Sequence, residues 1–172
     1  MVIWLCGLSG SGKTTIGRMI YDRARPKVPN LVLLDGEDLR IAFGNDLGHD
    51  QEGRRRNSVR IANVCQVLDR QGIHVICCAM TIAPEAQAAN RKHIQEYYEV
   101  LLDVSMDVLE SRDRKGIYRR ARAGQLHNVC GVDIPYVLPA HPHLVIDNNP
   151  LREDLSSMVD EILAIAPLEQ AL

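Results

Sequence analysis

The sequence lacks any large excess of charge. Its 172 residues include 20 Lys and Arg against 22 Asp and Glu, which gives a formal net charge of −2 at pH 7. A chain so balanced has no broad field to hold it on nucleic acid or on an anionic membrane surface. We therefore expect neither nucleic acid nor membrane as a partner, and any basic site must be local.

Paired cysteine motifs are missing as well. The five cysteines are an odd number, and no two of them form a CxxC pair. Cys77 and Cys78 are adjacent in an apolar run, so on a strand they would face opposite ways. We expect buried, reduced thiols, which are typical of a cytoplasmic protein.

No stretch of the chain is apolar for long enough to span a membrane, and there is no internal repeat or low-complexity segment. The first ten residues, MVIWLCGLSG, have no basic lead-in and run directly into a glycine-rich loop. We expect a buried strand there rather than a signal peptide. The length suits one domain over residues 1–172 that buries a core without disulfides or metals.

What the sequence does have is a regular alternation of apolar runs and amphipathic stretches. The predicted strands are 2–6, 31–34, 73–79, 98–104 and 143–146, and the predicted helices are 13–24, 55–70, 84–95 and about 107–112. A last helix is predicted to run to about residue 165, with Asn148-Asn149-Pro150 as its cap. This order predicts an α/β three-layer sandwich, in which helices cover both faces of a five-stranded parallel sheet. Residues 114–142 are rich in Arg, Gly and Pro without periodicity, and we expect a basic lid there.

Residues 7–14, GLSGSGKT, match the pattern G-x-x-x-x-G-K-[ST] in full, with a predicted strand before them and a predicted helix after them. The glycines let the backbone wrap around phosphates, and the helix N-terminus adds partial positive charge. In this pattern Lys13 reaches the β- and γ-phosphates of ATP, and the Thr14 hydroxyl is a ligand of Mg²⁺. The sandwich is therefore predicted to be of the P-loop NTPase type, with ATP held by Gly7, Leu8, Ser9, Gly10, Ser11, Gly12, Lys13, Thr14 and Thr15.

Two carboxylates follow the second predicted strand. Asp35 and Glu37 flank Gly36, and Arg40 comes shortly after. Because the carboxyl ends of parallel strands line the ligand crevice, we expect Asp35 to help hold Mg²⁺ and one of the two carboxylates to accept a proton from an acceptor hydroxyl. Together with Lys13 they are the predicted catalytic residues, although an Asp-Gly pair is also a common turn.

The pattern favours a small-molecule kinase over a nucleotide switch, because no NKxD-type base-reading motif is present. Two basic clusters support this prediction. The first contains Arg54, Arg55, Arg56 and Arg60, which repel one another unless an anion or an acidic partner lies among them, and we predict that Arg54 binds an anion. The second lies in the lid and includes Lys115; a basic lid over phosphates excludes water and stabilises charge in the transition state.

Several of these segments together resemble the adenylylsulfate (APS) kinase family. The resemblance covers nearly the whole chain and is carried by residues 7–15, 35–40, 112–118, 121–124 and 131–136, and by Arg54 with Asn57. This family transfers the γ-phosphate of ATP to the ribose 3′-hydroxyl of adenylyl sulfate with Mg²⁺, and it commonly works as a homodimer. The resemblance implies that Arg40, Arg54 and Asn57 hold the nucleotide acceptor and that Lys115 lies in the lid over both substrates.

Several positions depart from the family pattern, among them Ile82, which stands where the family has proline. Glu37 stands where the family has Asp, and Thr81 where it has Ser; His49 and Val129 replace two phenylalanines that sandwich the adenine of adenylyl sulfate. Base stacking on an aromatic ring contributes about 1–3 kcal/mol per base, so the loss of both rings would weaken adenine capture. We count His49, Thr81 and Val129 with the predicted acceptor site.

These departures resemble a divergent branch of the family, found with capsule biosynthesis, whose acceptor is cytidine diphosphoramidate. We take adenylyl sulfate, and thus sulfate activation, as the first expectation. Cytidine diphosphoramidate or another nucleotide-linked acceptor is the alternative. A non-catalytic ATP-binding subunit and a kinase of a non-nucleotide metabolite such as a sugar acid also stay open.

Overall fold

The computed structural model describes residues 1–149 and 154–168, and its centre is one parallel sheet. The strands follow the order β2-β3-β1-β4-β5, and every neighbouring pair is parallel. The continuous apolar runs of β1 and β3 are buried along their whole length, as strands must be when both faces of the sheet are covered. The predicted α/β fold with a five-stranded parallel sheet is therefore confirmed. The strands are β1 Val2–Cys6, β2 Leu31–Asp35, β3 His74–Cys78, β4 Tyr97–Asp103 and β5 Leu144–Asp147.

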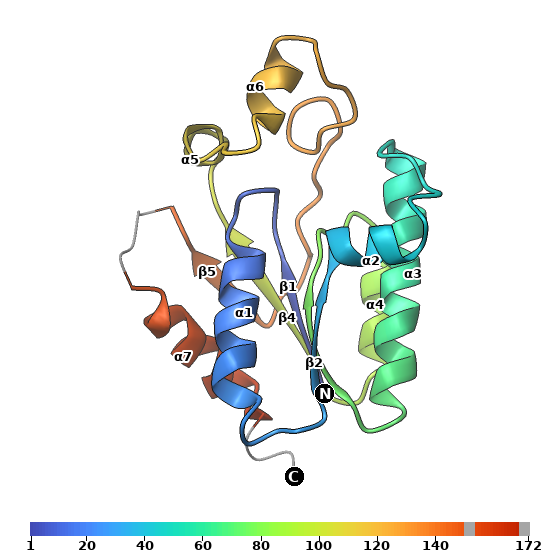
Figure 1. Ribbon diagram of the computed structural model, residues 1–172, viewed down its shortest axis with the longest axis vertical. Helices are drawn as coiled ribbons and strands as arrows, with labels where there is room; N and C mark the ends of the chain where they lie inside the picture. Colours follow the sequence, from blue (N-terminus) through green and yellow to red (C-terminus); the bar gives the residue numbers. More distant parts are fainter. Residues whose placement is uncertain (150–153, 169–172) are drawn as a thin grey trace.

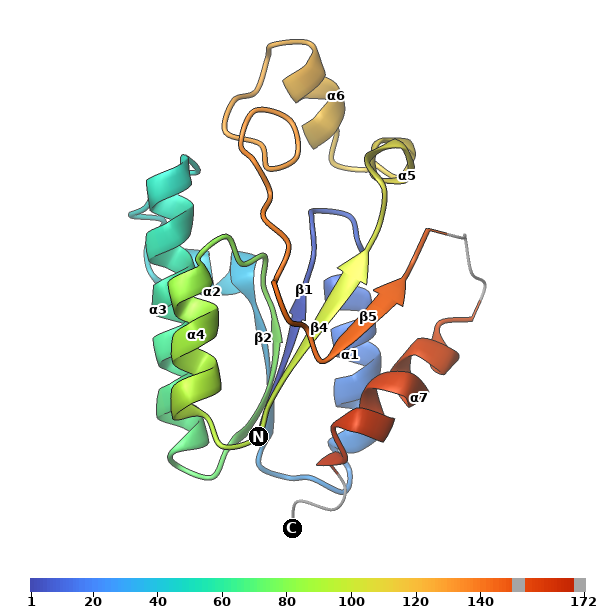
Figure 2. The same cartoon turned by 180° about the vertical axis from the view of Figure 1, so that it is seen from behind.

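Helices form a layer on each side of the sheet (Figures 1 and 2). Helices α1 and α7 pack on one face, whereas α3 and α4 pack on the other. Within the described residues, no helix combines the length and the apolar character needed to cross a membrane. The helices are α1 Lys13–Ala24, α2 Gly36–Ala42, α3 Gln51–Asp69, α4 Pro84–His93, α5 Met106–Ser111, α6 Ile117–Arg122 and α7 Ser156–Ile165.

The alternation of side chains along each strand divides the core in two. Ile3 and Leu5 of β1 pack against α1 and α7, while Trp4 faces α3 and α4. Cys77 and Cys78 lie on opposite faces as predicted, and all five cysteines are buried and free of disulfides. Full burial of a large aliphatic side chain such as Ile3 or Leu5 contributes roughly 1.5–3 kcal/mol to the stability of the fold. The two layers therefore hold the strand ends in fixed positions.

The carboxyl ends of the strands share one end of the sheet, and the segment with α5 and α6 stands above them (Figures 1 and 2). This is the end where the glycine-rich loop follows β1 and where Asp35 closes β2. Doubly wound sheets bind their ligands at this end.

The helices differ from the predicted ones in several places. Helix α2 was not predicted, and α3 begins at Gln51 rather than at residue 55 because Asp50 caps it, accepting a hydrogen bond from the Gly53 N–H. The arginine cluster therefore lies inside α3 instead of opening it. The lid, expected to be irregular, contains the short helix α6.

The predicted cap of the last helix is also wrong in part. Helix α7 begins only at Ser156, and the Asn148 side chain donates to the Ser11 carbonyl of the glycine-rich loop instead. Pro150, the third residue of the predicted cap, lies outside the described residues.

Candidate functional site

The loop over residues 7–14 connects β1 to α1, and its fold depends on the backbone conformations of its glycines. Gly7, Gly10 and Gly12 have φ values of 145°, 81° and 99°, which residues with a Cβ rarely adopt. A Cβ on Gly7 would lie 2.6 Å from Ser11 Oγ and 2.8 Å from the Leu102 carbonyl oxygen. Helix α1 has no side-chain cap and no acidic residue in its first turn, so its N–H groups face an open position suited to phosphate.

Lys13 folds back over this loop. Its Nζ donates to the carbonyl oxygens of Gly7 at 2.9 Å and Leu8 at 2.7 Å. Burial lowers the pKa of the ammonium to about 8, although the neighbouring Cys78 thiol raises it. A partly desolvated cation at the mouth of a loop of N–H groups is arranged to receive anionic phosphates.

Asp35 and Thr14 lie in direct contact. Thr14 Oγ1 donates to Asp35 Oδ2 at 2.6 Å, while Asp35 Oδ1 caps α2 by accepting the Glu37 N–H at 2.8 Å. A hydroxyl beside a carboxylate is the hard oxygen donor set that Mg²⁺ uses together with substrate phosphates. Among the described residues, no group of three or more His, Cys, Asp or Glu side chains is placed to hold a metal ion.

Glu37 joins α2 to the lid. Lys115 Nζ donates to both of its carboxylate oxygens, at 2.9 and 2.7 Å, and both side chains are exposed. An exposed pair of this kind contributes about 0–1 kcal/mol, so a substrate group can displace it.

Arg40 and Arg54 surround the loop between α2 and α3. Arg40 Nη1 donates to the Leu47 and Gly48 carbonyls at 2.7 and 3.2 Å, and Arg54 Nε donates to the His49 carbonyl at 2.7 Å. Partial burial of the His49 ring, together with the charges of Arg40 and Arg54, lowers the pKa of His49. The structure therefore places three of the predicted acceptor residues in one positively charged group.

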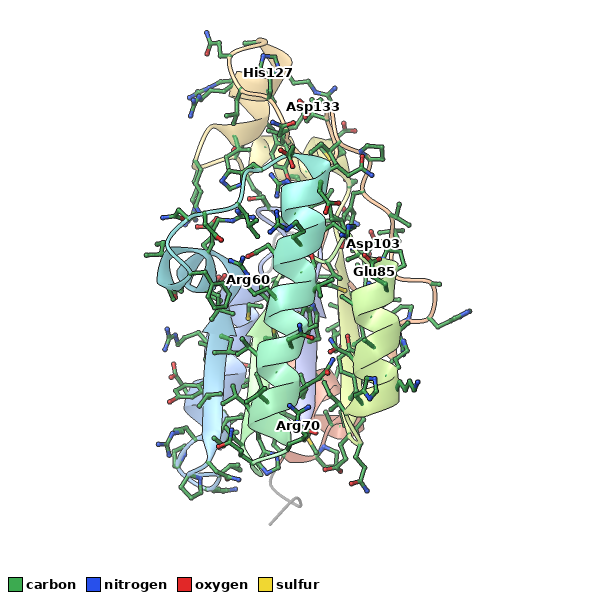
Figure 3. The ribbon with its side chains drawn as sticks, turned by 90° about the vertical axis from the view of Figure 1, so that its right-hand side faces the viewer. Arg60, Arg70, Glu85, Asp103, His127 and Asp133 are labelled. Atoms are coloured by element: carbon green, nitrogen blue, oxygen red, sulfur yellow. The ribbon has the colours of Figure 1, made fainter. Side chains whose placement is uncertain are left out.

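Arg54 also reaches the lid, because its Nη2 donates to the Asn128 carbonyl at 2.7 Å. Asp133 fixes that part of the lid by accepting the Asn128 N–H; Figure 3 shows Asp133 and His127 in the lid, above the amino-terminal end of α3. Two other arginines of the cluster have acidic partners: Arg55 pairs with Glu52 and Glu85, and Arg60 with Asp46.

Two more predicted acceptor residues are buried. Asn57 on α3 is 8% exposed and Thr81, after β3, is 1% exposed. Within the described residues, Thr81 Oγ1 has no hydrogen-bond partner. A buried hydroxyl without a partner is costly, so this position is suited to a polar group that arrives with a ligand.

Val129 follows Asn128, the lid residue whose carbonyl accepts from Arg54. It is buried in a small apolar cluster of the lid with Val104, Leu109 and Tyr118, against which Leu8 of the glycine-rich loop also packs. This lid cluster joins the lid to Val104 and to Leu109 of α5, and it rests on the loop.

Two contacts to the glycine-rich loop were given no role by sequence reasoning. Tyr118 of α6 donates its hydroxyl to the Ser9 carbonyl at 2.7 Å, and Asn148 after β5 donates its Nδ2 to the Ser11 carbonyl at 2.9 Å. These residues are 109 and 137 positions away from their partners, so no local pattern could have indicated the contacts.

Comparison with known proteins adds a family to this geometry. The profile of the family described as adenylylsulphate kinase matches residues 1–147. The cytidine diphosphoramidate kinase of Campylobacter jejuni is 39% identical over 162 residues, which cover 94% of each chain. The adenylyl-sulfate kinase of Pseudomonas aeruginosa is 36% identical over 171 residues, covering 98% of this chain and 86% of that one.

Among solved structures, the APS kinase CysC of Mycobacterium tuberculosis in complex with AMPPNP and APS superposes with a TM-score of 0.85. It is 29% identical to this chain, and the match covers 96% of both.

Proposed function

We propose that this chain, which belongs to the adenylylsulfate kinase family, transfers the γ-phosphate of ATP to the ribose 3′-hydroxyl of a nucleotide acceptor. The observation that carries the proposal is the contact of Thr14 Oγ1 with Asp35 at 2.6 Å. It joins a carboxylate at the end of β2 to the first turn of α1, beside a loop shaped for phosphates. Arg40, His49 and Arg54 form a group that follows Asp35 in the sequence. The lid contacts this group through Asn128 and the glycine-rich loop through Tyr118.

On the ATP side, the loop N–H groups and Lys13 would bind the β- and γ-phosphates. Thr14 and Asp35 are the residues that would hold Mg²⁺, which neutralises phosphate charge when bound. Because Lys13 already lies over the loop, it needs only to turn its ammonium from the Gly7 and Leu8 carbonyls to the nucleotide.

Glu37 is the carboxylate to which we assign the proton of the acceptor hydroxyl. Both oxygens of Asp35 are engaged inside the site, by Thr14 and by the Glu37 N–H. Among the described residues, the Glu37 side chain is held only by Lys115, in an exposed pair that an acceptor hydroxyl can displace. A base that receives the proton as the hydroxyl attacks contributes roughly 10²–10⁴-fold to the rate.

For the acceptor we propose cytidine diphosphoramidate. The relative that acts on it is 39% identical along 94% of this chain. A second support comes from the two positions expected to clamp adenine, since His49 offers one ring at the surface and Val129 is buried in the lid cluster. A site with one small ring suits a pyrimidine better than a purine held between two rings.

Adenylyl sulfate is the second candidate. Several relatives between 32% and 38% identical are adenylyl-sulfate kinases, and the Arg40, Arg54 and Asn57 positions of the family pattern are retained here. These residues recognise parts common to both acceptors, so they support the reaction more than the choice of base.

The test is a side-by-side assay of ADP release from ATP·Mg²⁺ with each acceptor and with none. We expect kcat/KM for cytidine diphosphoramidate to exceed that for adenylyl sulfate at least tenfold. Asp35→Asn should abolish both activities, while Asp38→Asn, which removes an exposed carboxylate of α2, serves as the control.

A preference for adenylyl sulfate would overturn the acceptor assignment and leave the kinase assignment standing. ADP release at the same rate without any acceptor would overturn the transfer reaction itself. Tight ATP binding with no transfer to either acceptor would instead favour a non-catalytic subunit.

A further inference from the structure

The carbonyl groups of the phosphate loop need hydrogen-bond partners, and the loop itself supplies only some of them. When successive N–H groups turn inward to receive phosphates, the carbonyls between them turn outward and need partners. Gly12 O is satisfied by the Ile16 N–H as α1 begins. Leu8 O accepts from the Ser11 N–H at 3.2 Å. Gly7 O and Leu8 O also accept from Lys13, whose ammonium is required elsewhere once ATP is bound.

Two side chains from distant segments hold the loop by its carbonyls. Tyr118 donates to Ser9 O at 2.7 Å and Asn148 donates to Ser11 O at 2.9 Å, on either side of Gly10. We propose that Tyr118 and Asn148 are positioning residues that fix the phosphate loop in its ATP-binding shape. This inference rests on the proposed function, because the loop must bind ATP for its shape to matter.

Asn148 is itself rigidly held. Its N–H donates to the Asp103 carbonyl at the end of β4 at 3.0 Å, and its carbonyl accepts from Arg112 at 2.8 Å. The side chain is buried and packs on Gly12, where an added Cβ would lie 3.0 Å from Asn148 Nδ2. Because β4, β5 and Arg112 fix the backbone of Asn148, its side chain can hold the Ser11 carbonyl at a constant position.

Tyr118 differs because it belongs to the lid. Its ring is 2% exposed within the lid cluster, and Asp113 fixes the start of α6 by accepting the Ile117 N–H. The hydroxyl therefore ties the Ser9 carbonyl to the position of the lid. Asn148, by contrast, links the Ser11 carbonyl to the sheet, because its own N–H donates to the Asp103 carbonyl of β4.

Without either contact, the nucleotide-free loop would spend part of its time in other shapes, and ATP binding would have to restore the binding shape. Once ATP is bound, its phosphates hold the loop in the ground state and in the transition state alike. Removing one should raise KM for ATP and leave kcat nearly unchanged. The net contribution of one hydrogen bond corresponds to about a threefold to tenfold change in affinity.

The experiment compares ATP affinity, by calorimetry, and ATP KM and kcat for the wild type, Tyr118→Phe, Asn148→Ala and Asn148→Asp. Tyr118→Phe removes only the hydroxyl, and Tyr21→Phe on α1 is its matched control. Asn148→Asp replaces the donor by an anion facing Ser11 O. We expect Tyr118→Phe and Asn148→Ala to raise Kd and KM threefold to tenfold with kcat within twofold, Asn148→Asp to raise them further, and Tyr21→Phe to change neither.

A wild type that does not bind ATP would refute the proposed function rather than this inference. A wild type that binds ATP while Tyr118→Phe and Asn148→Ala keep its Kd and KM would overturn the inference. Variants that lower kcat at constant KM, or lower only the melting temperature, would overturn it too, because those results reflect a loss of folded protein.

Discussion

Lys13 should make the ATP affinity of this protein depend on pH. Burial lowers the pKa of its ammonium from the usual 10.5 to about 8, even though the nearby Cys78, Cys6 and Asp35 side chains raise it. The charged form pairs with the phosphates of ATP and the neutral amine does not. Above pH 8, each further unit should therefore lower the association constant for ATP by up to tenfold.

The same lowered pKa has a consequence for stability. The unfolded chain keeps the higher pKa, so between about pH 8 and 10.5 the unfolded state binds more protons than the folded one. The free energy of unfolding must then rise with pH in this interval. A fall in pKa of this size corresponds to about 3 kcal/mol, by which Lys13 destabilises the nucleotide-free protein at pH 7.

Calorimetric ATP titrations and urea unfolding from pH 7.5 to 10 measure both effects. Lys13→Met should bind ATP weakly at every pH, be more stable than the wild type by up to about 3 kcal/mol at neutral pH, and lack the rise in stability above pH 8. Lys92→Met removes an exposed lysine of α4 and should behave as the wild type. Constant ATP affinity of the wild type across this range, or an equal rise in stability in Lys13→Met, would show that Lys13 is not the titrating group.

Further predictions concern the acceptor side. Glu37→Gln should keep the Kd for ATP within twofold in calorimetry and lower kcat at least 100-fold, and a kcat above half of the wild-type value would show that Glu37 is not the base. His49→Phe should raise kcat/KM for adenylyl sulfate about fivefold or more, because the added ring gives adenine a surface to stack on. An unchanged kcat/KM would show that adenine does not bind beside residue 49. Val129→Phe should instead overpack the lid cluster and lower the free energy of unfolding by about 1–3 kcal/mol in urea titrations; an unchanged midpoint would contradict the burial of Val129.

The strands were predictable because burial on both faces leaves an unbroken apolar run. The sequences VIWLC and HVICC read as strands without further context, and β1 and α1 agree with the predicted bounds. Helix α2 gave no such signal, since none of its residues is buried and it spans seven residues. The first turn of α3 was missed for a similar reason, because its polar residues are marked only by the Asp50 cap.

The candidate site also has features that the sequence alone indicates and features that depend on the fold. The phosphate loop and the two carboxylates are local patterns, so the sequence alone indicated where they lie, and the roles assigned to them stay predictions. The contact between Thr14 and Asp35 required the sheet to bring β1 and β2 to one end. Tyr118 and Asn148 reach the loop from far along the chain, and the apolar surroundings of Val129 depend on how the lid folds, which no spacing in the sequence expresses.

A nucleotide kinase with this site must pass a phosphoryl group from ATP bound at Gly7–Thr14 to its acceptor. Incubation with ATP labelled in the γ-phosphate, Mg²⁺ and cytidine diphosphoramidate, followed by separation of the products, shows where that group goes. We expect the label on the ribose 3′-hydroxyl of the acceptor, and we expect Lys13→Met to prevent its transfer. Label found only in inorganic phosphate, in equal amounts with and without cytidine diphosphoramidate or adenylyl sulfate, would mean that the protein is not a nucleotide kinase.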